Sequence, residues 1–478
     1  MSLRLYELSV YYGLSWFSHS SILVFFIFLV IFFGIISVPK LFSESNILNK
    51  LSTSLLFVTS LFLLFFLLRT LNSTTVQDEF IIKLLYITDY QQYFGDTLIL
   101  LVLLITFFSW WFLSERYIFK NKFLVFYLLI FFFCTVNMVS TVHLIIMFIF
   151  FEFIFFPSIF FAYQLSYSKK AEKTIEYLVL WTLSGAMIAF SGFGLLFYLT
   201  GTTNFISTIA YNFSIYEIFS LFVLFFLGFG IKIPLWPFYY WLTKVHVEAP
   251  TGFSMFLSGF LVKTAFFCFS QVFYFLYFET SFNIAISLIL WGVCDASSRM
   301  WSLLDIKRLI ALATVQEMNM IMIFLFLLSN SNYTILNSFL LIHGLLSVFF
   351  FFLVDMVYKQ AQTRNLTILG GLSLSSFKLL CFIWVAILIY RGFPVFSKFF
   401  IEWELTTILL QNLLGFGFLL MLFFSMIGAG SFFKHWTSAS YSSPELLSIQ
   451  NFLTYKDFVI GKVCIGLLFL INFSFYLF

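Results

Sequence analysis

Long apolar runs, separated by short polar breaks, occupy most of this chain. The hydrocarbon core of a bilayer is about 30 Å thick, so each helical crossing needs roughly 20 apolar residues. Only 10% of the 478 residues are charged, whereas a soluble domain usually carries about 25%. A water-soluble fold is therefore almost excluded, and the net charge of +4 is too small to indicate a nucleic-acid partner. The sequence predicts one all-α polytopic membrane protein.

The apolar runs predict fourteen transmembrane helices. They lie near residues 14 to 38, 53 to 70, 95 to 115, 122 to 140, 142 to 164, 174 to 200, 216 to 240, 252 to 277, 280 to 304, 308 to 329, 332 to 357, 376 to 411, 413 to 433 and 457 to 478. Lys and Arg collect on one face of a membrane, and 16 of the 25 lie in connections after odd-numbered spans, against three on the opposite face. This asymmetry predicts both termini on the charge-poor side.

The first residues fit neither a transit peptide nor a cleaved signal peptide, so we expect insertion without a removable leader.

Two of the predicted spans contain internal breaks, at Pro234 and Pro237 in the seventh and at Arg391 to Pro394 in the twelfth. A span tolerates proline where its backbone lines a hydrated cavity buried in protein. Pro234 and Pro394 are 160 residues apart, so we expect two inverted five-helix repeats with matching broken helices 7 and 12. The expected domains are three N-terminal helices, the first repeat, the second repeat, and a connecting loop with the final helix, at 1–121, 122–278, 279–435 and 436–478.

Ionisable side chains occur inside the predicted spans. They are Glu152, Lys232, Lys263, Arg299, Glu317, His343, Asp355, Arg391, Lys398, Glu402, Glu404 and Lys462. Each costs about 2.5 to 3.5 kcal/mol at a helix centre, so such residues usually mark a polar pathway. The five cysteines lie far apart without a CxxC pair, so no metal, iron–sulfur or disulfide framework is expected. We interpret the 76 Phe mainly as lipid-facing filler. The ionisable side chains inside the spans therefore predict a transporter, a channel or a pump.

An ordered set of motifs narrows this class. GIKIPLWP at 230–237 is followed by WLTKVHVEAP at 241–250 and LVKT at 261–264. Phe151-Glu152, DIKRLIA at 305–311, His343-Gly344 and Gly370-Gly371 match in the same order. Over roughly residues 120 to 435 the chain resembles subunit 4 of the proton-pumping NADH:ubiquinone oxidoreductase, respiratory complex I. HVEAP distinguishes this subunit family from its two antiporter-like relatives.

The resemblance implies fourteen helices with two inverted five-helix repeats, forming one proton-translocating module of the membrane arm. It implies that this chain binds no cofactor itself, while the complex uses NADH, FMN, iron–sulfur clusters and ubiquinone in or with other subunits. The implied partners are other membrane-arm subunits, especially the antiporter-like ones, accessory subunits and lipids. The implied location is the mitochondrial inner membrane, with the basic loops on the matrix side and both termini on the intermembrane-space side.

The resemblance also implies a proton path along Glu152, Lys232, Lys263, His343 and Glu402. Opposite charges stabilise each other's ionised forms while burial disfavours both, so separating Glu152 from Lys232 would push a proton off the lysine. A static ion pair that locks two helices is the alternative. Lys263 and His343 suit proton hops through water, although a hydrogen-bonded core His is the plainer interpretation of His343. Glu402 matches the terminal carboxylate of the family's second half-channel.

Several positions depart from the family pattern or compete for a role. Many members have a His where this chain has Glu317, which puts that position in doubt as a relay member, although Glu317 could substitute in a different charge state. Glu404 competes with Glu402, but two residues apart on a helix they face different directions. We favour Glu402 and expect Glu404 and Lys398 to be a neighbouring ion pair.

Three further ionisable residues have open interpretations. His246 and Glu248 are expected in the connection after the seventh span, at the basic face, where they shape proton uptake or, more often for loop residues, are structural or exposed. Arg391 lies beside the broken twelfth span, and the sequence gives no role for it.

Two other functions compete with a complex I subunit. A subunit of a multi-subunit sodium/proton antiporter shares this repeat fold, and purification without redox subunits would favour it. An inactive scaffold in the membrane arm would retain the fold without transport. The HVEAP motif argues against the antiporter, and the retained Glu152, Lys232, Lys263 and Glu402 argue against the scaffold.

Overall fold

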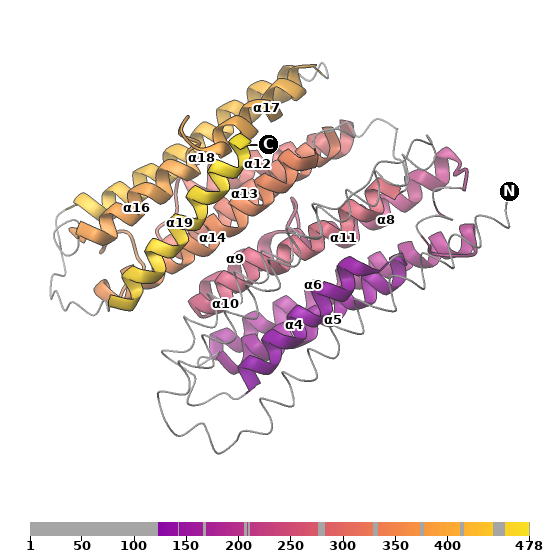
Figure 1. The fold of residues 1–478 in the computed structure, drawn as a ribbon, viewed down its shortest axis with the longest axis horizontal. Helices are drawn as coiled ribbons and strands as arrows, with labels where there is room; N and C mark the ends of the chain where they lie inside the picture. Colours follow the sequence, from indigo (N-terminus) through magenta and orange to yellow (C-terminus); the bar gives the residue numbers. More distant parts are fainter. Residues whose placement is uncertain are drawn as a thin grey trace.

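The computed structural model describes most of the chain from Phe123 onward as a bundle of helices that run side by side (Figure 1). The described residues are 123–141, 143–165, 169–204, 208, 211–275, 283–327, 333–372, 377–411, 415–442 and 455–477. The first three predicted helices, the domain at 1–121 and the N-terminus lie outside these residues. The described part contains no strand and only two isolated β-bridges.

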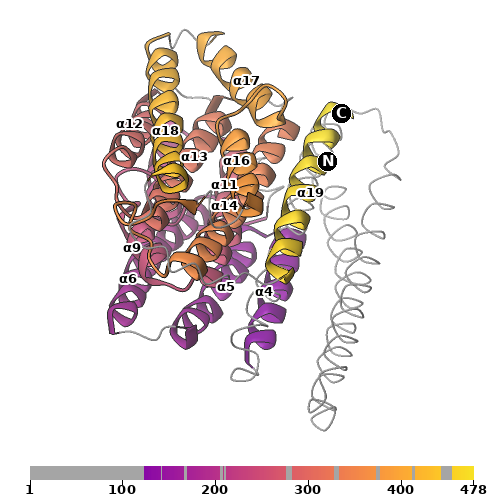
Figure 2. The same cartoon turned by 90° about the vertical axis from the view of Figure 1, so that its left-hand side faces the viewer.

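The colours of Figure 1, which follow the sequence, change gradually across the bundle of helices. The helices are α4 (Phe123–Ser140), α5 (Leu144–Leu165), α6 (Lys169–Thr200), α8 (Ile215–Lys232), α9 (Tyr240–Glu248), α10 (Thr251–Phe256), the π-helical turn η1 (Leu257–Leu261), α11 (Val262–Phe275), α12 (Asn283–Met300), α13 (Ile306–Leu327), α14 (Tyr333–Ala361), α16 (Phe377–Tyr390), α17 (Ser397–Gln411), α18 (Gly415–Tyr441) and α19 (Tyr455–Leu477). Helices far apart in the sequence also pack together, as α12 does with α18 (Figure 2) and α14 with α19. Each predicted span from the fourth onward falls on one of these helices or on a broken pair.

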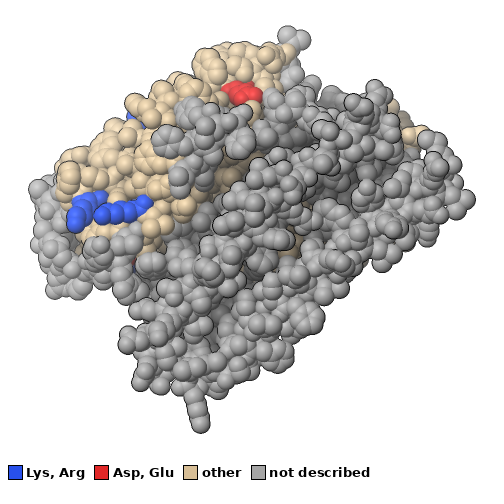
Figure 3. All heavy atoms as spheres, viewed as in Figure 1, with Lys and Arg blue, Asp and Glu red and all other residues tan. Residues whose placement is uncertain are grey.

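Six helical segments of the described residues are long and apolar enough to cross a membrane. They are Glu172–Thr200, Ile215–Lys232, Thr251–Phe273, Ile306–Leu327, Ile335–Ala361 and Gly417–Tyr441. Figure 3 shows a described surface that is largely uncharged on one face, with small patches of basic and acidic atoms. The chain is a multi-pass membrane protein, while the total of fourteen crossings and the inverted repeats stay predictions.

Burial separates inner helices from outer ones. The apolar windows of Thr251–Phe273 and Ile306–Leu327 are entirely enclosed by protein, and that of Ile335–Ala361 is 94% buried. The window in α18 is only 28% buried. The enclosed helices α11, α13 and α14 carry Lys263, Glu317 and His343, so the fold places these ionisable groups in the middle of the bundle.

The Phe-rich runs differ from the interpretation as lipid filler. All four residues from Phe349 to Phe352 are at most 3% exposed, and Phe131 is fully buried. Phe148, Phe193 and Phe229 join a cluster of tilted and edge-on rings between α5, α6 and α8. Large rings fill space between helices and prefer such geometries, so these Phe residues pack inside the protein. Other Phe side chains are more than half exposed, as the interpretation expects; they include Phe153, Phe156 and Phe190.

Both predicted helix breaks are confirmed. The seventh span is interrupted between Lys232 and Tyr240, where Pro234 has a φ of +27° and the Trp236–Pro237 bond is cis. The twelfth is interrupted between Tyr390 and Ser397, where Gly392 has a φ of +63°. Positive φ is readily adopted by glycine, which has no Cβ. The breaks leave backbone groups that side chains can contact inside the bundle.

A third irregularity was not predicted. The eighth span, expected to be continuous, contains the π-helical turn η1 at Leu257–Leu261. Such turns shift the hydrogen-bond register, and they are frequent at functional sites. Here the irregular turn ends two residues before Lys263.

Helices α6 and α8 pack with their backbones in close approach. A Cβ atom at Gly228 would lie 2.6 Å from the backbone nitrogen of Ala189, and one at Gly185 would lie 2.7 Å from the carbonyl oxygen of Gly228. Small residues permit such approach between membrane helices. This contact fixes α8, and with it Lys232, against its neighbour.

Candidate functional site

The ion pair expected between Glu152 and Lys232 is present. Glu152 comes from α5 and Lys232 from the last turn of α8, and the Lys232 Nζ donates a hydrogen bond to Glu152 Oε1. The side chain of Lys232 is 1% exposed and that of Glu152 is 23% exposed. The Nζ also lies 4.4 Å and 4.5 Å from the ring centres of Phe151 and Phe155. Ring faces attract cations, so this ammonium group has two kinds of partner; its role as a switch stays a prediction.

Lys263 lies one break further along the chain, in the first turn of α11. It is fully buried, and its Nζ donates a hydrogen bond to the backbone carbonyl of Ser258 in η1. The polar contact of this buried lysine is thus a backbone carbonyl within the π-helical turn.

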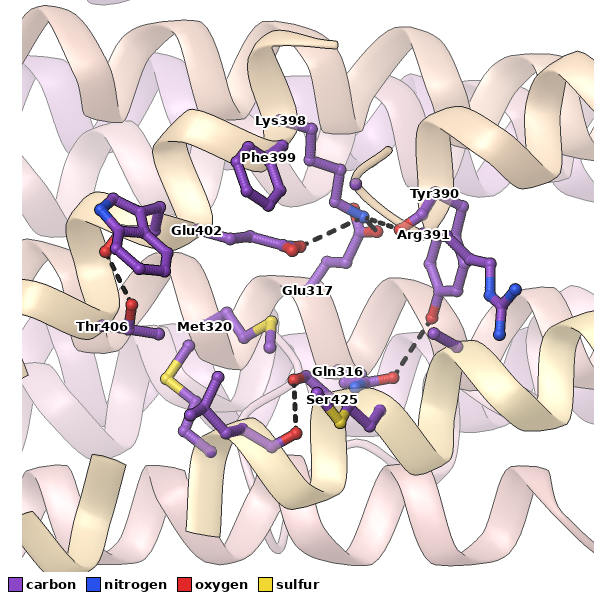
Figure 4. A pocket seen from close by; sticks show the side chains of 16 residues that line it. Gln316, Glu317, Met320, Tyr390, Arg391, Lys398, Phe399, Glu402, Thr406 and Ser425 are labelled. Carbon is purple, nitrogen blue, oxygen red and sulfur yellow. Dashed lines mark hydrogen bonds and ion pairs between the residues drawn. The ribbon is translucent and has the colours of Figure 1, made fainter. Parts of the chain in front are cut away.

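A second ionic cluster lies where α13, α14 and the broken pair α16–α17 meet (Figure 4). Lys398 Nζ is 2.5 Å from Glu317 Oε1 and 3.6 Å from Glu402 Oε1. The same Nζ donates a hydrogen bond of 2.7 Å to the backbone carbonyl of Tyr390, the last residue of α16. It also lies 4.3 Å from the centre of the Tyr390 ring. His343 Nε2 lies 3.8 Å from Glu317 Oε2. One lysine is thus shared by carboxylates from two helices.

This arrangement corrects one expectation. Lys398 was expected to pair with Glu404, but the ion pairs of Lys398 join it to Glu317 and Glu402. Lys398 and Glu402 are four residues apart, so they lie on the same face of α17. Six residues separate Lys398 from Glu404, which places Glu404 on a different face.

A cavity of about 210 Å³ adjoins the cluster. Its lining includes Gln316, Glu317, Tyr390, Arg391, Lys398 and Glu402, and Figure 4 shows several of these side chains facing it. A water molecule occupies about 30 Å³ in the liquid, so a cavity of this size has room for several beside its polar lining groups. The cavity can therefore be hydrated.

Arg391 lines the outer part of this cavity. The residue is exposed, and its guanidinium group lies 4.6 Å from the ring centre of Phe433 on α18. Its backbone amide continues the hydrogen bonding of α16 by donating to the carbonyl of Ile387. The break thus carries a cation at the mouth of the cavity.

His246 and Glu248 were expected in a loop, but they lie in α9. His246 is fully buried, stacks on Phe351 with ring centres 4.7 Å apart, and makes no hydrogen bond through either ring nitrogen within the described structure. The carboxyl end of α9 is contacted by two cations. Lys307 donates to the carbonyl of Ala249, and Arg364 donates to that of Val247 at 2.9 Å. Cations are favoured at this end of a helix dipole.

Two pairings were missed by sequence reasoning. Glu317 was singled out without a partner, although the spacing of Lys398 and Glu402 indicated a common helix face. Asp295, on α12, was not counted among the ionisable residues within spans; it accepts hydrogen bonds from the hydroxyl of Tyr239 and from Arg299 Nε, the latter at 2.8 Å. The four-residue spacing of Asp295 and Arg299 could have predicted their ion pair, because residues four apart lie on the same face of a helix.

Metal and disulfide chemistry has no visible site in the described residues. No group of three or more His, Cys, Asp or Glu side chains there is placed to hold a metal ion, and all five cysteines are unpaired.

The fold and the enclosed ion pairs define a multi-pass membrane protein with ionisable groups buried across its bundle. Residues 141–428 match the family described as NADH:quinone oxidoreductase/Mrp antiporter, TM, and the chain belongs to that family. It is 34% identical to NADH-ubiquinone oxidoreductase chain 4 of Paramecium tetraurelia, over 69% of this chain and 70% of the relative. It is 29% identical to chain 4 of Marchantia polymorpha, covering 52% of this chain and about half, 51%, of that relative. The resemblance inferred from the motifs is confirmed.

Solved structures of related complexes share the fold. A chain of respiratory complex I from Thermus thermophilus superposes with a TM-score of 0.70 at 19% identity, covering 80% of each chain. A chain of the Mrp complex from Dietzia sp. superposes with a TM-score of 0.68 at 16% identity, covering 75% of this chain and 68% of the other. At these identities the likeness concerns the fold.

Proposed function

We propose that this chain is a proton-translocating membrane-arm subunit, subunit 4, of NADH:ubiquinone oxidoreductase. In this proposal the complex transfers electrons from NADH to ubiquinone, and this chain moves protons across the inner mitochondrial membrane in response. It acts as part of a translocase and carries no redox centre of its own. NADH, FMN, iron–sulfur clusters and ubiquinone are used in or with other subunits.

The observation that carries the proposal is a row of enclosed titratable groups across the bundle. Glu152 on α5, Lys232 on α8, Lys263 on α11, His343 on α14 and Glu402 on α17 come from five different helices. Buried ionisable groups are costly in a membrane protein and are functional by default. Curated relatives named NADH-ubiquinone oxidoreductase chain 4 support this assignment.

The pair in the first half is the proposed switch. While Glu152 contacts Lys232, its negative charge stabilises the ammonium form against the cost of burial. When a change elsewhere in the complex moves or neutralises Glu152, the buried lysine loses that support and its proton passes on through water. Lys263 and His343 accept it in turn, because a buried amine and an imidazole both bind protons reversibly.

The proposal extends to the architecture. Fourteen crossings would form three N-terminal helices at 1–121, inverted repeats at 122–278 and 279–435, and a final segment at 436–478. The basic connections would face the matrix and both termini the intermembrane space. The partners would be the other membrane-arm subunits, especially the antiporter-like ones, with accessory subunits and lipids.

A sodium/proton antiporter subunit is the second candidate. The name of the matching family and the likeness to a chain of the Mrp complex favour it. The curated relatives described above, both named chain 4 of the oxidoreductase, favour the first candidate.

Substitution of the switch pair tests the function. We expect Lys232→Ala and Glu152→Ala, in the assembled complex reconstituted into liposomes, to lower the number of protons taken up per NADH oxidised. Positioned proton-transfer groups typically contribute 10² to 10⁴-fold, so transfer through this chain would fall by about 10²-fold or more. Lys244→Ala, at a lysine of α9 that contacts the rings of Tyr177 and Tyr240, is the control and should leave the ratio unchanged. A normal ratio in both switch variants would refute the relay, and purification of the chain without redox subunits would favour the antiporter.

A further inference from the structure

Lys398 occupies an unusual position in the second half of the bundle. Its side chain is 2% exposed, yet it is the common partner of Glu317 on α13 and Glu402 on its own helix, at 2.5 Å and 3.6 Å. The carbonyl of Tyr390, freed at the end of α16, accepts a further hydrogen bond from Nζ. The amine therefore has two carboxylate partners, one on α13 and one on its own helix α17.

The contacts form a continuous series. His343 Nε2 lies 3.8 Å from one oxygen of Glu317, and the other oxygen of Glu317 contacts Lys398. Lys398 in turn reaches Glu402. Two groups of the proposed relay, His343 and Glu402, are thus connected by two residues that the relay does not include.

The cluster holds two carboxylates and one amine, so these three groups carry a net charge of −1 when all are ionised. Lys263 on α11 also interacts electrostatically with Glu317 and His343. Glu317, at 4% exposure, is the carboxylate held away from water, and proteins relieve such a charge by pairing or by proton uptake. His343 and Tyr390 also face this cluster, and neither ring nitrogen of His343 has a hydrogen-bond partner among the described residues. The cluster has the composition of a site that binds and passes on one proton.

The adjoining cavity gives the series an outer end. Glu402 is 28% exposed at its side chain, whereas Glu317 is 4% exposed. Both line the cavity of about 210 Å³, together with Lys398. Water in this space would connect Glu402 to the outside of the bundle, while Glu317 stays in contact with its interior.

We propose that Glu317 and Lys398 are two further proton-carrying residues, which join His343 to Glu402. This inference rests on the proposed function. The N–H bond of the Lys398 ammonium breaks as its proton passes to a water molecule of the cavity, which gives one of its own protons to Glu402 Oε1, leaving a neutral amine and an unchanged water. That amine takes the proton of the Glu317 carboxyl group, and the resulting carboxylate is protonated again by the imidazolium of His343. One proton has then moved from His343 to Glu402, and no other reactant is consumed.

An arginine substitution separates a proton carrier from a static ion pair. Arginine keeps the positive charge and offers several N–H donors to both carboxylates, but it does not release its proton in proteins. If Lys398 only forms a static ion pair, the protein should tolerate Lys398→Arg. If Lys398 carries a proton, the substitution should stop that transfer. We expect the assembled K398R complex to oxidise NADH with fewer protons pumped per NADH, with transfer through this chain slowed by about 10²-fold or more.

A second variant covers the case in which arginine does not fit. Glu317→Gln keeps the size of the side chain and one acceptor oxygen but removes the carboxyl proton, and the same loss is expected. Glu404→Gln, on another face of α17, is the matched control and should pump normally. A wild-type proton-to-NADH ratio in assembled K398R or E317Q overturns the inference.

Measuring Lys232→Ala in parallel distinguishes failure of this further inference from failure of the proposed function. If K232A loses pumping while K398R retains it, the further inference fails and the proposed function stands. If all of these variants pump normally, the proposed function fails as well.

Discussion

Trp241 connects the break after α8 back to the helix that it follows. Its indole N–H donates a hydrogen bond of 2.8 Å to the carbonyl of Ile231, one residue before Lys232. Both residues are buried, at 1% and 4% exposure. A buried carbonyl near a helix end needs a donor, so this side chain stabilises the backbone that carries the proposed switch.

We expect Trp241→Phe to destabilise the protein by about 1 to 3 kcal/mol, because it removes a buried hydrogen bond while keeping an aromatic ring. The measurement is the midpoint of heat inactivation of the detergent-purified complex. Trp291→Phe makes the same change at a side chain on α12 that is 65% exposed, and it should have no effect. Equal midpoints for the two variants would contradict this role of Trp241.

The two clusters differ in how far their residues alone could predict them. Glu152 and Lys232 lie in spans with recognisable motifs, and their contact was expected. Glu317 and Lys398 are 81 residues apart, and nothing local indicates which carboxylate a buried lysine will reach. Their contact depends on how α13 and α17 are juxtaposed, which is a property of tertiary packing.

At the scale of helices, apolar length and proline predicted most of the described architecture. The breaks at Pro234 and Pro394 follow from the missing amide hydrogen of proline and the clash of its ring with the preceding turn. The π-helical turn at Leu257–Leu261 contains no proline, and therefore no comparable signal predicts it. The Phe runs were assigned to lipid because hydrophobicity alone does not distinguish a lipid-facing ring from one packed between helices.

The close packing of α6 on α8 gives an element-scale prediction. Gly228→Ala would place a methyl group 2.6 Å from the backbone of Ala189, and backbone cannot yield as a flexible side chain does. Overpacking of this kind costs about 1 to 3 kcal/mol. We expect a lower midpoint of heat inactivation and less assembled complex. Gly194→Ala, on α6 and with nothing within 4 Å of the added atom, is the control and should be neutral. Wild-type behaviour of G228A would show that the helices can separate at little cost.

For the whole molecule, the charge asymmetry makes a prediction about orientation. Because 16 of 25 basic residues lie in connections after odd-numbered spans, both termini should share one side of the membrane. Tags placed at each terminus in turn should be equally accessible to protease added to intact inner-membrane vesicles of one orientation. Cleavage of one terminal tag and protection of the other would mean that the termini lie on opposite sides and that the number of crossings is odd.

The exposure of the ionisable residues has a consequence for how this chain communicates with its surroundings. The side chains of Lys232, His343 and Lys398 are at most 2% exposed, whereas those of Glu152 and Glu402 are 23% and 28% exposed. Of these five residues, the two acidic ones are therefore those that a neighbouring molecule can contact. A signal that reaches this set by direct contact acts first on a carboxylate, and the lysines respond through their ion pairs with it.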